Sequence, residues 1–230
     1  MNKISIIIPI YNEAANIGTL INHLNQSSSA QLIEEIIVVD GGSTDISLDL
    51  VTGLDGVTVL NADKGRAKQM NLGAKQAKAD ILYFLHADSF PPQNFDQFIM
   101  TEVAKGHLAG CFRLQFDSNH WWLRLASWLT QFKWRACRGG DQSLFITKDL
   151  FNEIGGYNED YIIYEDNILI NALYSRKQFV VIQEKIITSA RCYERNGIWR
   201  LQYHFWAIYV KKWFGASADE LYAYYKKNIR

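Results

Sequence analysis

Along the first ninety positions, apolar runs of strand length alternate with apolar residues at helical spacing. The β-branched run from Ile4 to Ile10 is followed by apolar residues three and four positions apart up to Leu24, and short apolar runs recur at 35–39 and 57–60. Runs of the first kind are typical of strands and spacing of the second kind is typical of helices. Strands that alternate with helices predict an α/β fold with a doubly wound, mostly parallel sheet and helices on both faces.

The run from Ile81 to Asp88 is apolar until a final acid, and we expect a strand buried on both faces with Asp88 at its carboxyl end. Ligands bind at that edge of an open α/β sheet. After Asp40, two glycines form a turn, and one of the residues 43–45 is expected to cap a helix that runs through Leu48 and Val51.

The second half of the chain is richer in aromatic residues. A small-residue face from Ala67 to Ala77 precedes it and suits close packing of a helix on a sheet. We then expect helices ending near Ala104, over 120–135, over 166–174 and near the C-terminal end, and strands over 108–116, 141–147, 179–182 and 186–190.

Composition narrows the class of protein. The chain has 230 residues, 48% of them hydrophobic, which suits one domain, here divided into halves 1–90 and 91–230. Lys plus Arg and Asp plus Glu each total 24, so a nucleic-acid partner is not expected. Three separated cysteines without CxxC spacing favour a reducing compartment over a structural zinc site. With neither a leader pattern nor an apolar run of membrane-spanning length, we expect a cytoplasmic protein, with a place at the inner face of the membrane as a further option.

Four short motifs lie at predicted strand ends or helix starts and carry the candidate chemistry. They are Pro9-Ile10-Tyr11-Asn12-Glu13, Val38-Val39-Asp40-Gly41-Gly42-Ser43-Thr44-Asp45, Leu85-His86-Ala87-Asp88 and Tyr164-Glu165-Asp166. In this order they resemble family 2 glycosyltransferases with the GT-A fold. Three further segments, Gly65 to Asn71, Gly140-Asp141-Gln142 and Thr188 to Arg191, resemble a small bacterial subgroup often labelled arsenosugar-biosynthesis-type glycosyltransferases.

The resemblance implies transfer of a sugar from a UDP- or GDP-sugar to a small-molecule or lipid-linked acceptor, with inversion. A departing diphosphate needs a cation, and carboxylate oxygen suits Mg²⁺ or Mn²⁺, so Asp88 is the expected metal ligand. The wider family usually has a second acid where this chain has His86, and we favour a contact of His86 with donor phosphate or sugar over ligation. By resemblance Asp166 is the general base, supported by Glu165.

The same resemblance assigns the remaining positions. The nucleotide is expected over the first two strand ends, beside Pro9. Tyr11, Asp40 and Arg66 are expected around the base, and Glu13 near the ribose. Asp141 and Gln142 are expected near the sugar or acceptor, and Arg191 near the diphosphate.

Each assignment has a structural alternative. Asp40 flanks glycines and fits a turn, Glu165 and Asp166 fit the N-terminus of a helix, and Arg66 and Arg191 fit exposed positions. Alternative functions are a non-catalytic nucleotide-sugar-binding protein, a nucleotidyltransferase or a membrane-surface scaffold. A nicotinamide dehydrogenase is disfavoured, since no G-x-G-x-x-G follows the first strand.

Two helices combine polar stripes with wide aromatic faces. Arg124, Ser127, Gln131 and Arg135 share one side of the expected 120–135 helix, and Arg200, His204 and Lys211 recur on the last one, beside several tryptophans. Such helices suit peripheral contact with a membrane. They equally suit packing of the aromatic faces on the core.

Overall fold

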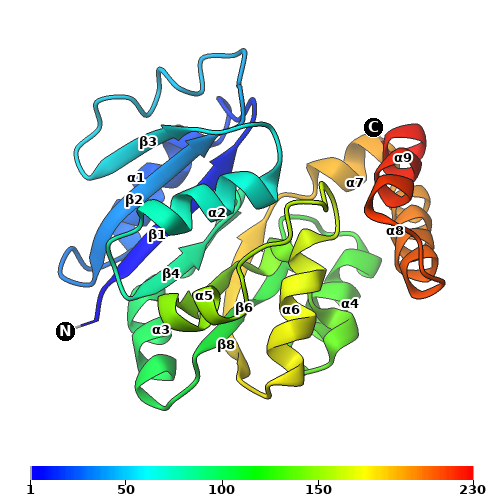
Figure 1. Ribbon diagram of the computed structural model, residues 1–230. Helices are drawn as coiled ribbons and strands as arrows, with labels where there is room; N and C mark the ends of the chain where they lie inside the picture. The colour runs from blue at the N-terminus through cyan, green and yellow to red at the C-terminus, as the bar shows by residue number, and fades with distance from the viewer. Residues whose placement is uncertain (1, 230) are drawn as a thin grey trace.

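A computed structural model describes residues 2–229 (Figure 1). The strands are β1 (Ile4–Ile10), β2 (Ile33–Asp40), β3 (Val57–Asn61), β4 (Ile81–Phe84), β5 (Ser89–Phe90), β6 (Ala109–Phe116), β7 (Leu144–Thr147) and β8 (Phe179–Thr188). The helices are α1 (Ile17–Ser27), α2 (Arg66–Gln76), α3 (Phe95–Ala104), α4 (Trp121–Leu129), α5 (Lys148–Glu153), α6 (Glu165–Ser175), α7 (Arg191–Asn196), α8 (Ile198–Trp213) and α9 (Ala218–Asn228), with 3₁₀ turns η1 (Arg135–Cys137) and η2 (Gly140–Gln142).

One sheet runs through both halves of the described chain, in the order β3-β2-β1-β4-β7-β6-β8-β5. β1 pairs in parallel with β2 and β4, β2 with β3, and β6 with β8, while β7 and β5 are antiparallel to their neighbours. The predicted α/β fold with a mostly parallel sheet is confirmed.

Both faces of the sheet are covered because successive strand residues point to opposite sides. Ile6 and Ile8 of β1 lie in a core cluster with α1 and α3, whereas Ile7 lies in a second cluster with α2, α5 and α6. The small-residue face of α2 packs closely, as predicted: a Cβ at Gly73 would lie 2.5 Å from Ile7 Cγ2. This contact sets a short distance between α2 and the middle of β1.

A third cluster joins α8 and α9 to the segment before α6, around Ile163, Leu201 and Leu221. Figure 1 shows α8 and α9, in orange and red, at the edge of the molecule, next to α7. Within residues 2–229 there is no helix of the length and apolarity needed to cross a membrane.

Two predicted boundaries in the first half are wrong. The strand that opens at Ile81 ends at Phe84, because the chain then turns: Ser89 N donates to the His86 carbonyl at 3.1 Å and Ser89 pairs with Thr188 of β8. Asp88 nevertheless follows the carboxyl end of β4. The helix expected through Leu48 and Val51 is a series of turns, in which Ser47 and Val51 are buried while most of their neighbours face solvent, too little packing to sustain a short helix.

Three boundaries in the second half also differ. The helix expected over 120–135 stops at Leu129, because the Thr130 hydroxyl donates to Ser127 O and accepts from Leu114 N. The strand expected over 141–147 begins at Leu144, after the turn η2 and the positive φ of Ser143. The two late strands are one strand, β8, with an irregular register opposite Phe112 and Arg113.

Candidate active site

The loops after β1 and β2 are tied together at the carboxyl edge of the sheet. Asn12 N donates to Ser43 Oγ and Glu13 N donates to Ser47 Oγ, each at 2.8 Å. The buried Asp40 carboxylate accepts bonds from the backbone of residues 42 and 43 at 2.9 Å. These are the contacts of a turn residue, so the donor-binding role of Asp40 stays a prediction.

Tyr11 follows the buried end of β1, where Pro9 lies opposite Val39. The Lys64 ammonium lies 3.6 Å from the centre of the Tyr11 ring, a cation–π contact that the sequence did not indicate. Gln69 Nε2 donates to the carbonyls of Ile10 and Val39 at 2.8 and 2.7 Å. Gln69 therefore fixes the spacing of the two strand ends.

Asp88 belongs to a group of three charged side chains. Arg191 Nη2 lies 2.6 Å from Glu13 Oε1 and 3.0 Å from Asp88 Oδ2. Burial raises the pKa of Asp88, against the lowering influence of His86 and Arg191. The structure therefore brings together three residues predicted for metal, ribose and diphosphate, from positions up to 178 apart in the chain.

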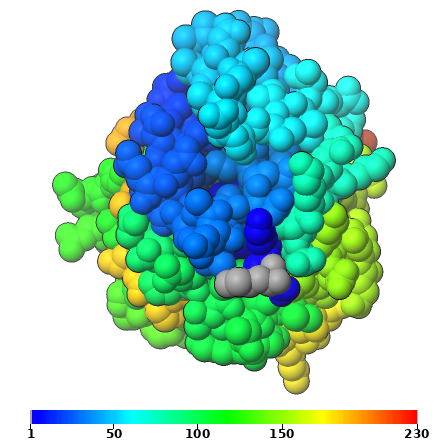
Figure 2. Space-filling view, turned by 90° about the vertical axis from the view of Figure 1, so that its left-hand side faces the viewer, coloured from blue at the N-terminus to red at the C-terminus, as the bar shows by residue number. Residues whose placement is uncertain are grey.

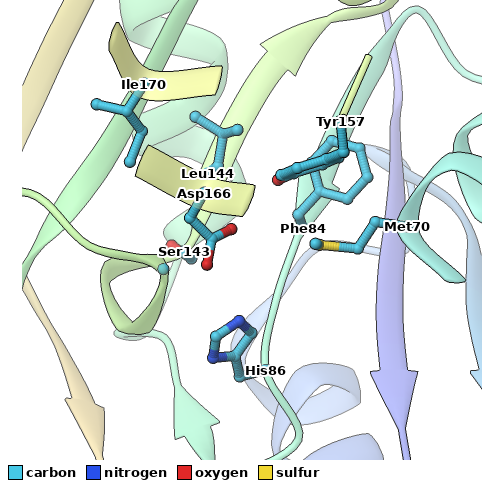
Figure 3. A pocket seen from close by; sticks show the side chains of 9 residues that line it. Met70, Phe84, His86, Ser143, Leu144, Tyr157, Asp166 and Ile170 are labelled. Atoms are coloured by element: carbon cyan, nitrogen blue, oxygen red, sulfur yellow. The ribbon is translucent and has the colours of Figure 1, made fainter. Parts of the chain in front are cut away.

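His86 and Asp166 form a second group with Asp141. His86 Nδ1 lies 3.3 Å from Asp141 Oδ1, and Figure 3 shows His86 pointing toward the Asp166 carboxylate. Burial lowers the pKa of His86, but the Asp141 and Asp166 carboxylates outweigh it and the net shift is upward. A Cβ at Gly140 would lie 2.0 Å from Asp166 Oδ2, so the turn η2 lies directly against this carboxylate.

Glu165 and Arg66 form an ion pair beside Asp166. Arg66 Nε lies 2.8 Å from Glu165 Oε1, and the Glu165 side chain is fully buried. Burial raises the pKa of Glu165, Arg66 opposes that rise, and Asp166 adds to it. The expected place of Arg66 was beside the nucleotide base; the contact seen instead joins the start of α2 to the start of α6.

Gln142 lies behind the site rather than in it. Its side chain is buried, its Oε1 accepts from Arg138 Nη1 at 2.6 Å, and its Nε2 donates to the Cys137 carbonyl at 2.5 Å. Arg138 is itself buried and also donates to the carbonyls of Thr130 and Phe132. This network holds η2, and thereby Asp141, in place. The sequence indicated no such role for Arg138, because a basic residue without a motif is expected at the surface.

The wall of the site beside Asp166 is closely packed (Figure 3). A cavity of about 10 Å³ separates Asp166 and His86 from apolar side chains that include Met70, Phe84 and Tyr157. This volume holds about one water molecule. A sugar therefore has to reach Asp166 from the open side of the cluster, where Asp141 is 55% exposed.

Within residues 2–229, no set of three or more His, Cys, Asp or Glu side chains is arranged to hold a metal ion. Asp88 has Arg191 as its near partner instead. Mg²⁺ is nevertheless often bound through one or two carboxylates together with substrate phosphates and water, so a single acid at this edge suits such an ion.

The sequence matches the family described as Glycosyl transferase family 2 over residues 5–179, most of the chain. The mostly parallel α/β sheet, with acids at its carboxyl edge, agrees with this match. The chain belongs to glycosyl transferase family 2, which confirms the resemblance carried by the motifs. The narrower resemblance to arsenosugar-biosynthesis-type glycosyltransferases stays a prediction.

Two curated relatives show the range of similarity. Glycosyltransferase AglE of Haloferax volcanii is 35% identical over 98 residues, covering 40% of this chain and 32% of AglE. Undecaprenyl-phosphate 4-deoxy-4-formamido-L-arabinose transferase of Proteus mirabilis is 27% identical over 136 residues, covering 55% of this chain and 41% of that protein. The chain thus spans well under half the length of these relatives.

Solved structures share the fold. The crystal structure of S. aureus TarS 1–349 in complex with UDP superposes with a TM-score of 0.67 at 18% identity, covering 81% of this chain and 60% of that one. The corresponding complex with UDP-GlcNAc gives a TM-score of 0.63 at 19% identity, covering 81% and 58% of the two chains.

Proposed function

We propose that this chain transfers a sugar from a nucleoside-diphosphate sugar to an acceptor hydroxyl, with inversion at the anomeric carbon. The observation that carries the proposal is the meeting of Asp88, Arg191, His86 and Asp166 at one edge of the sheet in a family 2 chain. Cationic and acidic groups at one edge suit a reaction in which a diphosphate departs as a hydroxyl is deprotonated. The UDP complexes of TarS support a UDP-sugar as the first donor to test, with GDP-sugars next.

Donor binding is assigned to the edge formed by β1, β2 and β4. Tyr11 and Asp40 would face the nucleoside, with the Lys64 ammonium over the Tyr11 ring adding positive charge there. Arg191 contacts Glu13 and Asp88 together, which suits a cation between the ribose and the diphosphate. Arg66 is 44% exposed beside its bond to Glu165, so the rest of its guanidinium is left for the donor.

A divalent cation, Mg²⁺ or Mn²⁺, would be held by Asp88 together with donor phosphates. Such an ion supplies charge stabilisation for the departing diphosphate. Its binding has to compete with the Arg191–Asp88 contact, so we expect weak metal affinity until the donor brings further oxygen ligands. His86 replaces an acid here, and its net raised pKa suits a contact with phosphate rather than with a metal ion.

Asp166 is assigned as the general base. In the displacement, the acceptor oxygen forms a bond to the anomeric carbon while its proton passes to the Asp166 carboxylate. The bond from the anomeric carbon to the diphosphate oxygen breaks, and the nucleoside diphosphate leaves with the electron pair. Glu165 and Gly140 position Asp166 from two sides, and Asp141 is left to contact sugar or acceptor. Gln142 acts through Asp141 rather than on the substrate.

Lipid-linked acceptors are the first class to test, because the named relatives include undecaprenyl-phosphate transferases. A second candidate function, nucleotide-sugar binding without transfer, is favoured by one observation. Arg191 is the near partner of Asp88, so its guanidinium can contact a donor diphosphate without a metal ion, and such a contact requires no transfer. Turnover separates the two functions.

The test combines binding and turnover. Thermal unfolding is measured with UDP- and GDP-sugars, with and without Mn²⁺, and release of nucleoside diphosphate is then followed for wild type and Asp166→Asn. We expect the variant to keep the donor-induced shift and to lose about 100-fold or more in turnover. Asp160→Asn, which changes an exposed acid in the loop before α6, is the matched control and should behave as wild type.

Two results would contradict these assignments. If Asp166→Asn turns over within a factor of about two of wild type, another group is the base. If wild type binds a donor and releases no nucleoside diphosphate with any acceptor or with water, the non-catalytic function holds.

A further inference from the structure

α8 carries a stripe of large apolar side chains that face solvent. The side chains recur at spacings of four and three residues, so they lie on one side of the helix, and they are 49 to 85% exposed. They are Trp199, Tyr203, Trp206, Val210 and Trp213. The opposite side of α8 is buried against α9 through Leu201 and Ile208. The side of α8 that packs on the rest of the protein is therefore not the side that carries the exposed stripe.

The start of α4 extends the stripe. The Trp121 ring, 59% exposed, lies 5.6 Å from the Trp199 ring. The Trp122 ring lies 5.3 Å from Trp199 and 6.0 Å from Trp206, and its Nε1 donates to Gln202 Oε1 at 3.1 Å. We call Trp121 and the exposed stripe of α8 the aromatic face. An exposed apolar surface of this extent marks an interaction site.

The charge around the aromatic face is strongly positive. Residues 191–229 contain seven Lys and Arg against three Asp and Glu, although the whole chain has a net charge of zero. Arg200, Lys211, Lys226 and Lys227 are exposed on α8 and α9. The partner of the aromatic face should therefore have a negatively charged surface and, below it, an apolar region that the aromatic rings can enter.

A second copy of the chain fits this chemistry poorly. The alternating spacing would also suit a helix-to-helix seam, but such seams favour Leu, Ile and Val rather than Trp and Tyr. A symmetric dimer would also set two positively charged regions against each other, which costs free energy. Trp and Tyr instead have an apolar ring with one polar atom, and they are enriched where lipid meets water.

We propose that the aromatic face docks on an anionic phospholipid surface, with the tryptophans at the boundary of headgroups and acyl chains and the lysines and arginines among the headgroups. The docked face would lie on the helix that contacts the start of α6, where Asp166 lies. Tyr209 of α8 donates to Asn167 Oδ1 at 3.2 Å, one residue after Asp166, and Lys212 Nζ donates to the Tyr161 hydroxyl at 2.5 Å. Delivery of a lipid-linked acceptor from the bilayer, but not the docking itself, rests on the proposed function.

Vesicle co-sedimentation tests the proposal without donor or acceptor, so it can fail independently of the transferase assignment. The purified 230-residue chain is mixed with vesicles containing phosphatidylglycerol or with phosphatidylcholine alone, at low and high salt. We expect binding to the anionic vesicles that salt weakens, and a loss of about ten-fold or more in Trp199→Ser/Trp206→Ser/Trp213→Ser.

The matched control removes exposed apolar side chains elsewhere. Leu50→Ser/Leu54→Ser changes the segment between β2 and β3, at the upper left of Figure 1 and far from α8. Figure 2 shows the side that this blue and cyan N-terminal part covers, where the red C-terminal residues are almost wholly hidden. This variant should bind vesicles like wild type.

A measurement on unaltered protein guards against misfolding of the triple variant: wild-type tryptophan fluorescence should shift to the blue with anionic vesicles and be quenched by brominated lipid. Three results would overturn the proposal. They are no vesicle binding by wild type, equal binding to neutral vesicles, or a wild-type dimer that the triple variant converts to monomer without any vesicle binding.

Discussion

The two partners of the Arg66–Glu165 ion pair differ in burial, and this difference predicts how much stability is lost when each one is removed. The Glu165 side chain has no exposed surface, whereas that of Arg66 is 44% exposed, and the two approach to 2.8 Å. Two unit charges with centres about 4 Å apart gain about 4 kcal/mol at an effective dielectric constant of about 20. Much of this gain offsets the cost of burying the carboxylate. Removing one partner should therefore not have the same effect as removing the other.

Arg66→Met leaves a buried carboxylate without its cation, and we expect the free energy of unfolding to fall by about 3–5 kcal/mol. Glu165→Gln removes the buried charge, and the half-exposed Arg66 guanidinium can turn to water, so the expected loss is about 1 kcal/mol. The double variant should resemble Glu165→Gln, because the charge that made the loss of Arg66 costly is gone.

The effect of Arg66→Met should also depend on pH. Burial raises the pKa of Glu165 in the folded protein above its ordinary value of 4.5, and loss of Arg66 raises it further. A raised folded pKa contributes stability that is fully present below the unfolded pKa and is lost as the pH rises through the folded pKa. Between the unfolded and the folded pKa of Glu165, the free energy of unfolding of Arg66→Met should fall by about 1.4 kcal/mol per pH unit relative to that of the double variant.

Urea unfolding at about pH 5.5 and about pH 7.5 measures all four proteins of this cycle. Lys68→Met is the matched control, since Lys68 lies on the same helix, is 43% exposed and pairs at 3.5 Å with an Asp63 that is 86% exposed. That pair should contribute less than about 1 kcal/mol. Equal losses for Arg66→Met and Lys68→Met, with no dependence on pH, would refute the reasoning from burial.

Two further predictions concern Asp166 and the cysteines. Gly140→Ala should lower turnover about ten-fold or more, because its Cβ would lie 2.0 Å from Asp166 Oδ2. Gly139→Ala is the control, since its Cβ meets nothing within 4 Å, and its turnover should not change. Steady-state kinetics and thermal unfolding distinguish loss of activity from loss of fold, and equal activity of the two variants would contradict the contact. Burial raises the pKa of Cys111 to about 11, so its thiol should react slowly with an alkylating reagent. Mass spectrometry after alkylation should find the exposed Cys192 labelled in folded protein and Cys111 labelled only on unfolding. Comparable labelling of both in folded protein would show that Cys111 is accessible.

Local patterns predicted the sheet and the order of its elements well, because buried strands need continuous apolar runs wherever they occur. They failed where one distant contact ended an element. β4 stops at Phe84 since the chain turns to pair with β8, and α4 stops at Leu129 since Thr130 bonds to β6. No spacing within either segment announces these partners.

Some residues of the candidate site could also be placed from local sequence, whereas their long-range contacts could not. Asp88 and Asp166 could be placed at a strand end and a helix start from their motifs alone. The Arg191–Asp88 contact and the burial of Gln142 by Arg138 could not, because they join positions far apart in the chain or bury a residue that local sequence places at the surface.

By itself, the sequence determined that the chain is an α/β glycosyltransferase with acids at the carboxyl edge of its sheet, and that two helices are rich in tryptophan. Only the tertiary structure decided which charges are buried and which apolar faces are left open. Helical spacing shows that Trp199, Trp206 and Trp213 share a side of α8 but not what covers that side. Leu201 and Ile208 take the side that packs on α9, and the aromatic side is left to solvent.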